Sequence, residues 1–218
     1  PAAGTWLADT PFRITGLKVK QETHRYLKRG SRGEDNEYER FIEAIDAREE
    51  KRRVERRRYN EFRAERKYKP YPDFDAVTFT DHAKPMLLTL LYTGMRPGEL
   101  RALGWGDVDF ANKRLTVRAA DTKTGTTRTI PMNQIVCDTL RNWRDQTNGI
   151  KTVFIKPDGT PIGSMRKVFD GILRAAKIES FRLYDLRHSF ASWLVQEGVD
   201  LYRIKDLMGH TTVTMTER

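Results

Sequence analysis

Apolar residues recur at helical spacing along the second half of the chain. Residues 85–92 (PMLLTLLY) are apolar nearly all round before Gly94, which predicts a fully buried helix. Elsewhere apolar residues fall at i, i+3 and i+4, the pattern of a helix with one buried face. This spacing predicts four further helices, around residues 136–143, 165–173, 186–194 and 201–208. In the third of them, Leu186, Phe190 and Leu194 form the stripe that we expect to face the core.

In the middle of the chain the pattern changes from helical to alternating. Residues 115–117 and 127–130 have the pattern of short strands, and the turn-forming residues at 121–125 join them. A two-stranded hairpin surrounded by helices follows from this pattern. We therefore expect a mainly α fold with a small antiparallel β-sheet, of the α+β class.

The first half of the chain is less regular and more charged. Residues 1–36 show little periodicity, whereas the apolar residues of 38–45 predict an amphipathic helix. Residues 46–69 then carry eleven Lys or Arg and six Asp or Glu, an excess of five positive charges. This composition favours a long solvated helix with i,i+4 pairs such as Glu49–Arg53. The alternative is a basic arm lying along a phosphate backbone.

Composition narrows the classes of protein that fit. The net charge of +10 favours a polyanionic partner, although many proteins are basic for no specific reason. No stretch is apolar for the 18 or more residues of a membrane-spanning helix, and no signal-peptide segment is present, so we expect a cytoplasmic protein without membrane contact. The single cysteine, Cys137, excludes an internal disulfide and a cysteine-based metal cluster. We expect it to be a small buried residue on a helix.

Candidate chemistry begins at Arg96, in the segment TGMRPGEL. Pro97 suits the first position of a helix, and Glu99 would lie in its first turn, where a carboxylate is favourable. Arg96 would then stand at a helix N-terminus, where free backbone N–H groups already favour an anion. A phosphate site is physically reasonable there, although an arginine beside a helix start is common.

A second group lies in the segment YDLRH, near the C-terminus. With the apolar stripe turned to the core, Tyr184, Arg187 and His188 would share another face of their helix. All three side chains can bind phosphate oxygens. Lys123, at the tip of the predicted hairpin, could reach such a site from above, and His210, just after Gly209, could close it from another side.

In this order, Arg96 in TGMRPGEL, Lys123 in TKTG, Arg187 in YDLRHSF and His210 in LMGH resemble the catalytic domain of the tyrosine recombinases, the phage-type integrases. The resemblance is strong over residues 80–218. It implies that the chain has the fold of that catalytic domain. It also implies that a bacterium or a phage encodes the protein. It also implies cleavage of a DNA strand without metal, nucleotide or other cofactor. A tyrosine attacks the phosphate, forms a 3′-phosphotyrosyl link and releases a 5′-hydroxyl.

The resemblance also assigns roles to the residues. Arg96 and Arg187 would clamp the non-bridging oxygens of the scissile phosphate, Lys123 would donate a proton to the leaving 5′ oxygen, and His210 would donate a hydrogen bond to the phosphate. Glu99 and His188 are expected to contact these residues and hold them in position without touching the phosphate.

One position departs from the family's commonest pattern. Tyr184 stands where the family usually has histidine, three residues before the second arginine. A phenol is a poor base near neutral pH. Tyr184 would instead hydrogen-bond the phosphate or orient its neighbours, which leaves water as an alternative proton acceptor.

The resemblance further predicts how the chain is organised. Residues 1–23 would be the linker from an N-terminal DNA-binding region, and residues 24–218 the catalytic domain, with the charged segment 46–69 unexplained by the family pattern. The family's nucleophilic tyrosine usually lies nine residues after the histidine of its Gly-His motif, which is position 219 here. The threonines from 211 onward would start the helix that carries it. We therefore expect residues 1–218 to bind DNA without cutting it.

Partners and competing functions follow from the same likeness. We expect double-stranded DNA as the partner, a synaptic homotetramer as the working form, and a monomer for the isolated domain. One alternative is an enzyme that resembles the type IB topoisomerases, which use a similar set of residues. Another is a DNA-binding regulator that kept the fold and lost the chemistry, an alternative to which Tyr184 gives some weight.

Overall fold

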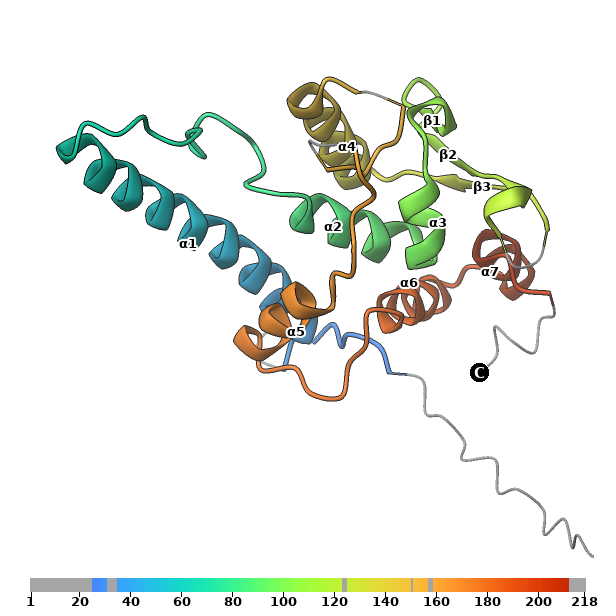
Figure 1. Cartoon of the computed structure of the whole chain (residues 1–218). Helices are drawn as coiled ribbons and strands as arrows, with labels where there is room; N and C mark the ends of the chain where they lie inside the picture. Colours follow the sequence, from blue (N-terminus) through green and yellow to red (C-terminus); the bar gives the residue numbers. More distant parts are fainter. Residues whose placement is uncertain (1–24, 31–34, 123–124, 150, 157–158, 212–218) are drawn as a thin grey trace, which may run out of the picture.

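The structure is a computed structural model that describes residues 25–30, 35–122, 125–149, 151–156 and 159–211 (Figure 1). Helices predominate in it. They are α1 (Glu37–Glu65), α2 (Ala83–Thr93), α3 (Pro97–Ala102), α4 (Gln134–Thr147), α5 (Arg166–Ala175), α6 (Asp185–Gln196) and α7 (Leu201–Met208). The strands are β1 (Val108–Asp109), β2 (Arg114–Val117) and β3 (Arg128–Pro131). The predicted fold class, mainly α with a small antiparallel sheet, is confirmed.

Helix α2 forms the centre of the molecule. Every residue of α2 except Lys84 is buried, because helices pack against it on opposite sides, α4 above and α6 below in Figure 1. The helix ends at Gly94, which has a left-handed φ of 64° and donates its N–H to the carbonyl of Leu90. The all-round apolar pattern of this segment therefore predicted its burial correctly.

The sheet has three antiparallel strands in the order β1-β2-β3. Leu115 of β2 lies between Val108 of β1 and Ile130 of β3, and all three side chains are buried. The two predicted strands are confirmed as β2 and β3. Strand β1 was not predicted, because two residues are too few to show an alternating pattern.

Helix α1 runs without a break across the predicted change at residue 46. Its 29 residues are mostly charged and exposed beyond the first turns, as expected of a long solvated helix. The predicted Glu49–Arg53 pair is wrong. Glu49 is buried and accepts hydrogen bonds from the backbone and hydroxyl of Thr80, whereas Arg53 donates to the carbonyls of Phe74 and Thr78. The segment that follows α1 and runs back along it, which we call the returning chain, therefore binds both residues that helical spacing would have paired with each other.

The core-facing side of α6 also differs from the predicted stripe. Leu186, Ser189 and Trp193 are buried, whereas Phe190 and Leu194 are only half-buried. Residues 25–30 cause this rotation, because they cross α6. Within them Leu27 is fully buried, its N–H donates to Ser189 Oγ, and its carbonyl accepts from Trp193 Nε1.

Other predictions are settled or lie outside the described ranges. Cys137 is fully buried on α4, as expected. The proposed linker and the helix start among the final threonines lie outside the described residues, apart from Thr211. Among the helices that the structure describes, none combines the length and apolarity needed to cross a membrane.

Candidate functional site

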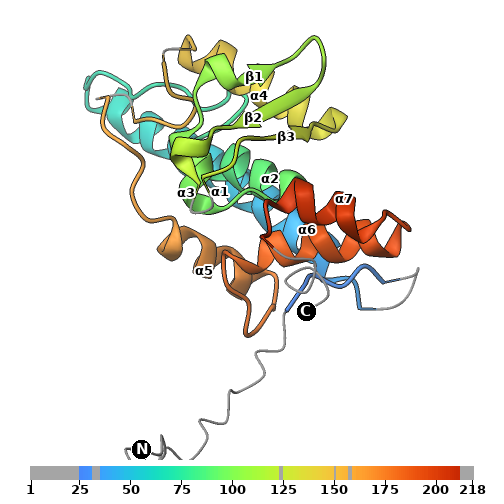
Figure 2. The same cartoon turned by 90° about the vertical axis from the view of Figure 1, so that its right-hand side faces the viewer.

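Three arginines from three different elements meet at the C-terminal end of α7. Figure 2 shows α7 beside α6 and below the sheet, so that its end faces β3 and the start of α3. A helix end leaves backbone carbonyls without helical partners, and these carry partial negative charge. Here each of the last carbonyls accepts a hydrogen bond from a different arginine: Leu207 from Arg128 Nε at 2.8 Å, Met208 from Arg187 Nη2, and Gly209 from Arg96 Nη2 at 3.3 Å.

Arg187 is the most deeply buried of the three. Its side chain comes from the first turn of α6, is 1% exposed, and also donates to the carbonyl of Gly94 at 2.6 Å. Its Nε is buried without a hydrogen-bond partner, and within the described residues no carboxylate forms an ion pair with it. Burial, together with the nearby charge of Arg96, lowers the pKa of Arg187 to about 10. A buried guanidinium held without a counter-ion is a strong site for an anion.

Glu99 holds the other two arginines together. It is 3% exposed, and its carboxylate accepts from Arg96 Nη1 at 2.8 Å and from Arg128 Nη1 and Nη2 at 3.1 and 2.6 Å. Burial acts to raise the pKa of Glu99, but the hydrogen bonds from Arg128 and Arg96 outweigh it and lower the pKa. One carboxylate thus compensates two arginines. We call Arg96, Arg128 and Arg187, together with Glu99, the arginine cluster, and it keeps an excess of positive charge.

Arg128 is the member of this group of arginines that sequence reasoning missed. It stands on β3, where Arg128 and Ile130 face inward while Thr129 and Pro131 face outward. A charged residue at an inward position of a strand normally needs a buried partner. That period-two position was the signal that could have identified Arg128 beforehand.

Gly209 allows the end of α7 to approach this cluster. Its φ of 63° lies in the left-handed region, and a Cβ at this position would lie 3.0 Å from Nη1 and 3.1 Å from Cδ of Arg128. Glycine is therefore required for both conformation and space. The Gly-His motif places His210 directly beside the arginines for this reason.

His210 lies half-buried at one wall of an open hollow of about 510 Å³. The hollow is also lined by Thr126, Thr127, Lys205 and Thr211. Burial, followed by the charges of Arg187 and Arg96, lowers the pKa of His210 to about 4. The imidazole is therefore neutral at pH 7 and can offer one N–H donor to an anion.

We expect His210 to titrate near pH 4 in an NMR titration, assigned by comparison with a His210→Gln variant. Because the nearby arginines repel its protonated form, Arg96→Gln should raise the pKa of His210, and so should added phosphate. His210 has its ordinary pKa of 6.5 in the unfolded chain, so between about pH 6.5 and 4 the unfolded state binds a proton at His210 that the folded state does not. The free energy of unfolding therefore falls as the pH falls through that range. Titration near 6.5 that neither change moves would contradict this arrangement of charges.

Tyr184 and His188 lie together at the start of α6. Their rings meet edge to face with centroids 5.2 Å apart; Tyr184 is 39% exposed and His188 is half-buried. Tyr184 is close enough to Arg187 to favour its charged form, but the guanidinium turns inward while the phenol faces solvent. The predicted shared face is thus correct for Tyr184 and His188 and wrong for Arg187.

Most of the predicted site residues come together in the structure. Arg96, Glu99, Arg187 and His210 meet around the end of α7, with Tyr184 and His188 beside them. Lys123 lies outside the described residues. Its hairpin neighbours Thr126 and Thr127 line the same hollow as His210, so the hairpin reaches the site.

Comparisons with known proteins agree with this geometry. The model of the phage integrase family matches residues 75–218. The chain is 31% identical over 141 residues to the integrase of Salmonella phage P22, covering 59% of this chain and 36% of that protein. It is 30% identical over 138 residues to the tyrosine recombinase XerC of Corynebacterium glutamicum, covering 60% and 44%. The chain therefore spans less than half the length of either relative.

Solved structures show the same fold. The XerH site-specific recombinase, bound to its difH substrate before cleavage, aligns with a TM-score of 0.60 and 19% identity over 90% of this chain and 51% of that one. The XerA recombinase aligns with a TM-score of 0.54 and 23% identity over 65% and 57%. At these identities the likeness establishes the fold.

Proposed function

This chain belongs to the phage integrase family, the tyrosine recombinases, and from that premise we propose that it acts in site-specific DNA recombination. It would cleave and rejoin DNA strands through a 3′-phosphotyrosyl link. The proposal is supported by the family match, by the fold, and by the XerH structure, in which a protein of this fold was solved with its DNA.

The convergence of Arg96 and Arg187 on the end of α7 carries the proposal. In-line attack on a phosphodiester increases the negative charge on the two non-bridging oxygens. A guanidinium binds such oxygens through two parallel hydrogen bonds and stays charged at working pH. Both arginines already lie at the end of α7, but both Nη atoms of Arg187 donate to backbone carbonyls, so direct contact with a phosphate would replace these hydrogen bonds.

His210 and Lys123 would complete the phosphate site. The neutral imidazole of His210 would donate a hydrogen bond to a non-bridging oxygen from the wall of the hollow. A lysine on a hairpin tip suits a general acid, because a long, titratable amine can follow the leaving 5′ oxygen. Glu99 would position Arg96 without touching the phosphate, since both its oxygens are taken by arginines.

Tyr184 would orient its neighbours rather than serve as the base. Its ring packs on His188 at the start of α6, at the turn that carries Arg187. Tyr184 would thereby hold His188 in place, and water would accept the proton of the attacking tyrosine.

The partner would be duplex DNA in the cytoplasm of a bacterium, and recombination would require a homotetramer that brings two duplexes together. Residues 1–218 contain no tyrosine after Tyr202, which is on α7, eight residues before His210. We propose that residues 1–218 by themselves are a monomer that binds duplex DNA.

Binding of duplex DNA by residues 1–218 should weaken steeply with salt. If the arginine cluster and its surroundings neutralise at least four phosphates, affinity should fall about a hundredfold or more between about 50 and 200 mM salt. Fluorescence anisotropy with a labelled duplex measures this, and a denaturing gel checks that the strands stay uncut. Arg141→Gln, an exposed position on α4, serves as the control and should bind normally. An affinity that does not change over this salt range would overturn the proposed DNA binding.

A further inference from the structure

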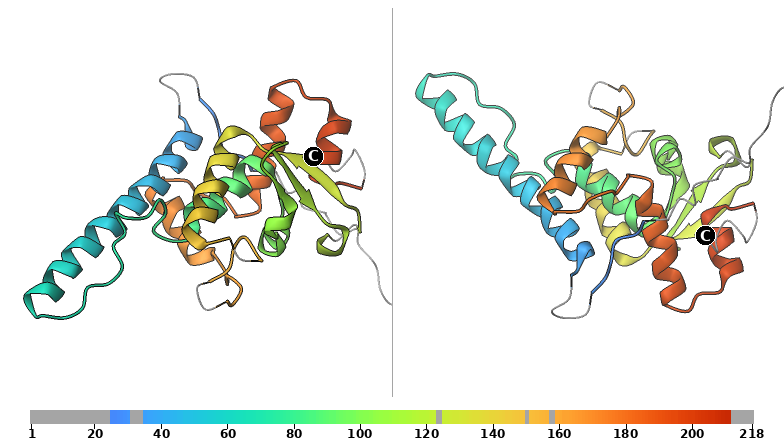
Figure 3. Two further views of the ribbon diagram at one scale, coloured as in Figure 1. Left: turned by 90° about the horizontal axis from the view of Figure 1, so that it is seen from above. Right: turned by 90° about the horizontal axis from the view of Figure 1, so that it is seen from below.

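The distal half of α1 projects from the body of the molecule together with the chain that returns from it. We call residues 52–75 the arm. Figures 1 and 3 show the arm at one end of the molecule and α6 and α7 at the other. The family match begins at residue 75, so all of the arm except its last residue lies outside the matched domain.

The arm is a built structure rather than a bare solvated helix. Arg56 donates to the carbonyl of Pro72 at 2.9 Å, Arg63 donates to the carbonyl of Lys69 at 2.7 Å, and Asn60 exchanges two hydrogen bonds with the backbone of Tyr71. The same guanidinium groups lie over aromatic rings of the returning chain, with Arg56 3.9 Å from the ring centre of Phe74. These contacts hold the returning chain along α1 and fix the positions of the charges.

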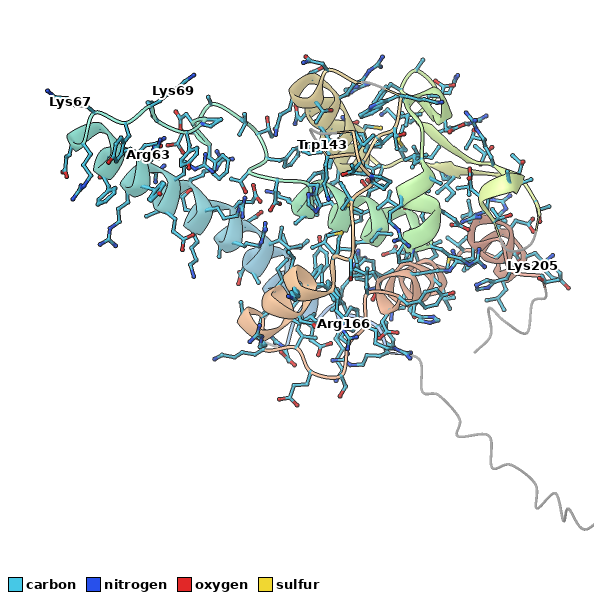
Figure 4. All side chains as sticks on the ribbon, in the orientation of Figure 1. Arg63, Lys67, Lys69, Trp143, Arg166 and Lys205 are labelled. Carbon is cyan, nitrogen blue, oxygen red and sulfur yellow. The ribbon has the colours of Figure 1, made fainter. Side chains whose placement is uncertain are left out.

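Much of the positive charge of the arm is not compensated by acids. The arm contains nine Lys or Arg and five Asp or Glu, a net charge of +4, and within it residues 56–69 hold seven Lys or Arg and two Glu. Arg56 and Arg63 use neutral carbonyls as acceptors. The exposed side chains of Arg58, Lys67 and Lys69 form no hydrogen bond or ion pair with any residue that the structure describes. Figure 4 shows Lys67 and Lys69 pointing outward at the tip.

The charge distribution selects the kind of partner. Outside the arm the chain has a net charge of +6, because its total is +10, so a second copy offers no overall charge complementarity to the arm. Duplex DNA carries regularly spaced phosphates that the lysines and arginines of the arm can neutralise. Exposed Tyr59 and Tyr68 add aromatic surface beside these charges.

We propose that the arm binds the phosphate backbone of a second stretch of duplex DNA, distinct from the stretch held at the arginine cluster. This rests on the proposed function, because it assumes that the cluster also binds DNA. The 29 residues of α1 span about 43 Å, so the tip lies well away from the site at α7. The second stretch is therefore a distant flank of the same duplex or a separate duplex.

Site-directed photo-crosslinking tests the contact directly. Because Cys137 is fully buried, a thiol-reactive photoprobe will label a new cysteine at Lys67→Cys, at Thr211→Cys beside the arginine cluster, or at the exposed control Lys151→Cys. With a duplex of about 40 base pairs, we expect crosslinks to DNA from the first two positions and none from Lys151→Cys. Two duplexes with different labels show whether both positions reach the same molecule.

The outcomes separate this proposal from the proposed function. Crosslinking from Thr211→Cys alone would overturn the arm contact and leave DNA binding at the cluster in place. Crosslinking from Lys67→Cys alone would support the arm contact and overturn DNA binding at the cluster. If neither variant crosslinks to DNA, both proposals are overturned. Crosslinking of Lys67→Cys to protein would show that the arm binds a protein, which overturns its assignment to DNA.

Charge removal provides a second measurement. Arg58→Gln, Lys67→Gln and Lys69→Gln together should lower the salt slope of binding to the long duplex by about two to three, at roughly 0.9 per lost phosphate contact. The matched triple variant Lys113→Gln, Arg141→Gln and Lys151→Gln removes the same charge from exposed positions of the body. If the salt slope falls equally in both triple variants, the effect depends on the overall charge alone, and the arm contact is overturned.

Discussion

Replacing Arg187 with alanine is expected to abolish DNA strand cleavage by the whole protein, with a loss of at least about a thousandfold in rate. Arg187 is buried and has no carboxylate partner among the described residues, so no neighbouring acid neutralises its charge. Removing it takes away one of two clamping guanidinium groups at the stage where negative charge grows. Trapping of covalent protein–DNA adducts on a nicked duplex measures the effect.

A folding control is needed, because Arg187 also joins Gly94 at the end of α2 to Met208 at the end of α7. Arg187→Lys keeps the charge at this place but loses the planar fork that binds two oxygens. It should unfold closer to the wild-type temperature than Arg187→Ala and still cleave poorly. Cleavage at the wild-type rate by a folded Arg187→Lys or Arg187→Ala variant would remove Arg187 from the site.

Replacing Arg128 with alanine is expected to lower the free energy of unfolding by about 3–5 kcal/mol, because it removes a partner of a buried carboxylate. Arg128 is 9% exposed, holds both oxygens of Glu99, and donates to the carbonyl of Leu207. For a chain of this size the midpoint of thermal unfolding should fall by roughly 6–20 °C. Thr129→Ala, at the next and outward-facing position of β3, should change stability little.

The pH dependence of stability identifies the mechanism of this loss. The pKa of Glu99 is lowered in the folded chain, so its stabilising effect is present above the ordinary value of 4.5 and is lost as the pH falls through the folded value. Urea unfolding at neutral and at acid pH should show this acid loss in the wild type and less of it in Glu99→Gln. Arg128→Ala that unfolds like Thr129→Ala would show that the buried contact contributes nothing.

Periodicity along the chain was sufficient to predict most helices. An α-helix satisfies its own backbone through local hydrogen bonds, so apolar spacing over eight or nine residues predicted α2, α4, α5, α6 and α7. The order of Arg96, Arg187 and His210 was also readable, because each stands in a short motif at the end of an element. That these three residues would lie together was therefore predictable before any coordinates.

Contacts between distant segments were not predictable in the same way. Helical spacing paired Glu49 with Arg53, but Thr80 on the returning chain takes Glu49 instead. The apolar stripe of α6 was displaced because residues 25–30 cover one side of that helix. Such contacts depend on which segments pack together, and this information is absent from a local window.

The arginine cluster shows where this division lies. Local sequence placed Arg96 before α3 and His210 after Gly209. Only packing brought Arg128 of β3 onto Glu99, and only packing turned Arg187 inward to the end of α7. A helix end exposes its carbonyls wherever it occurs, but which guanidinium reaches them depends on the neighbours that the fold provides. The sequence by itself thus determined which cationic groups are present, and the tertiary structure decided that they share one helix end. Like charges can be buried side by side only where carboxylate and carbonyl oxygens lie between them, and only the folded chain provides those oxygens.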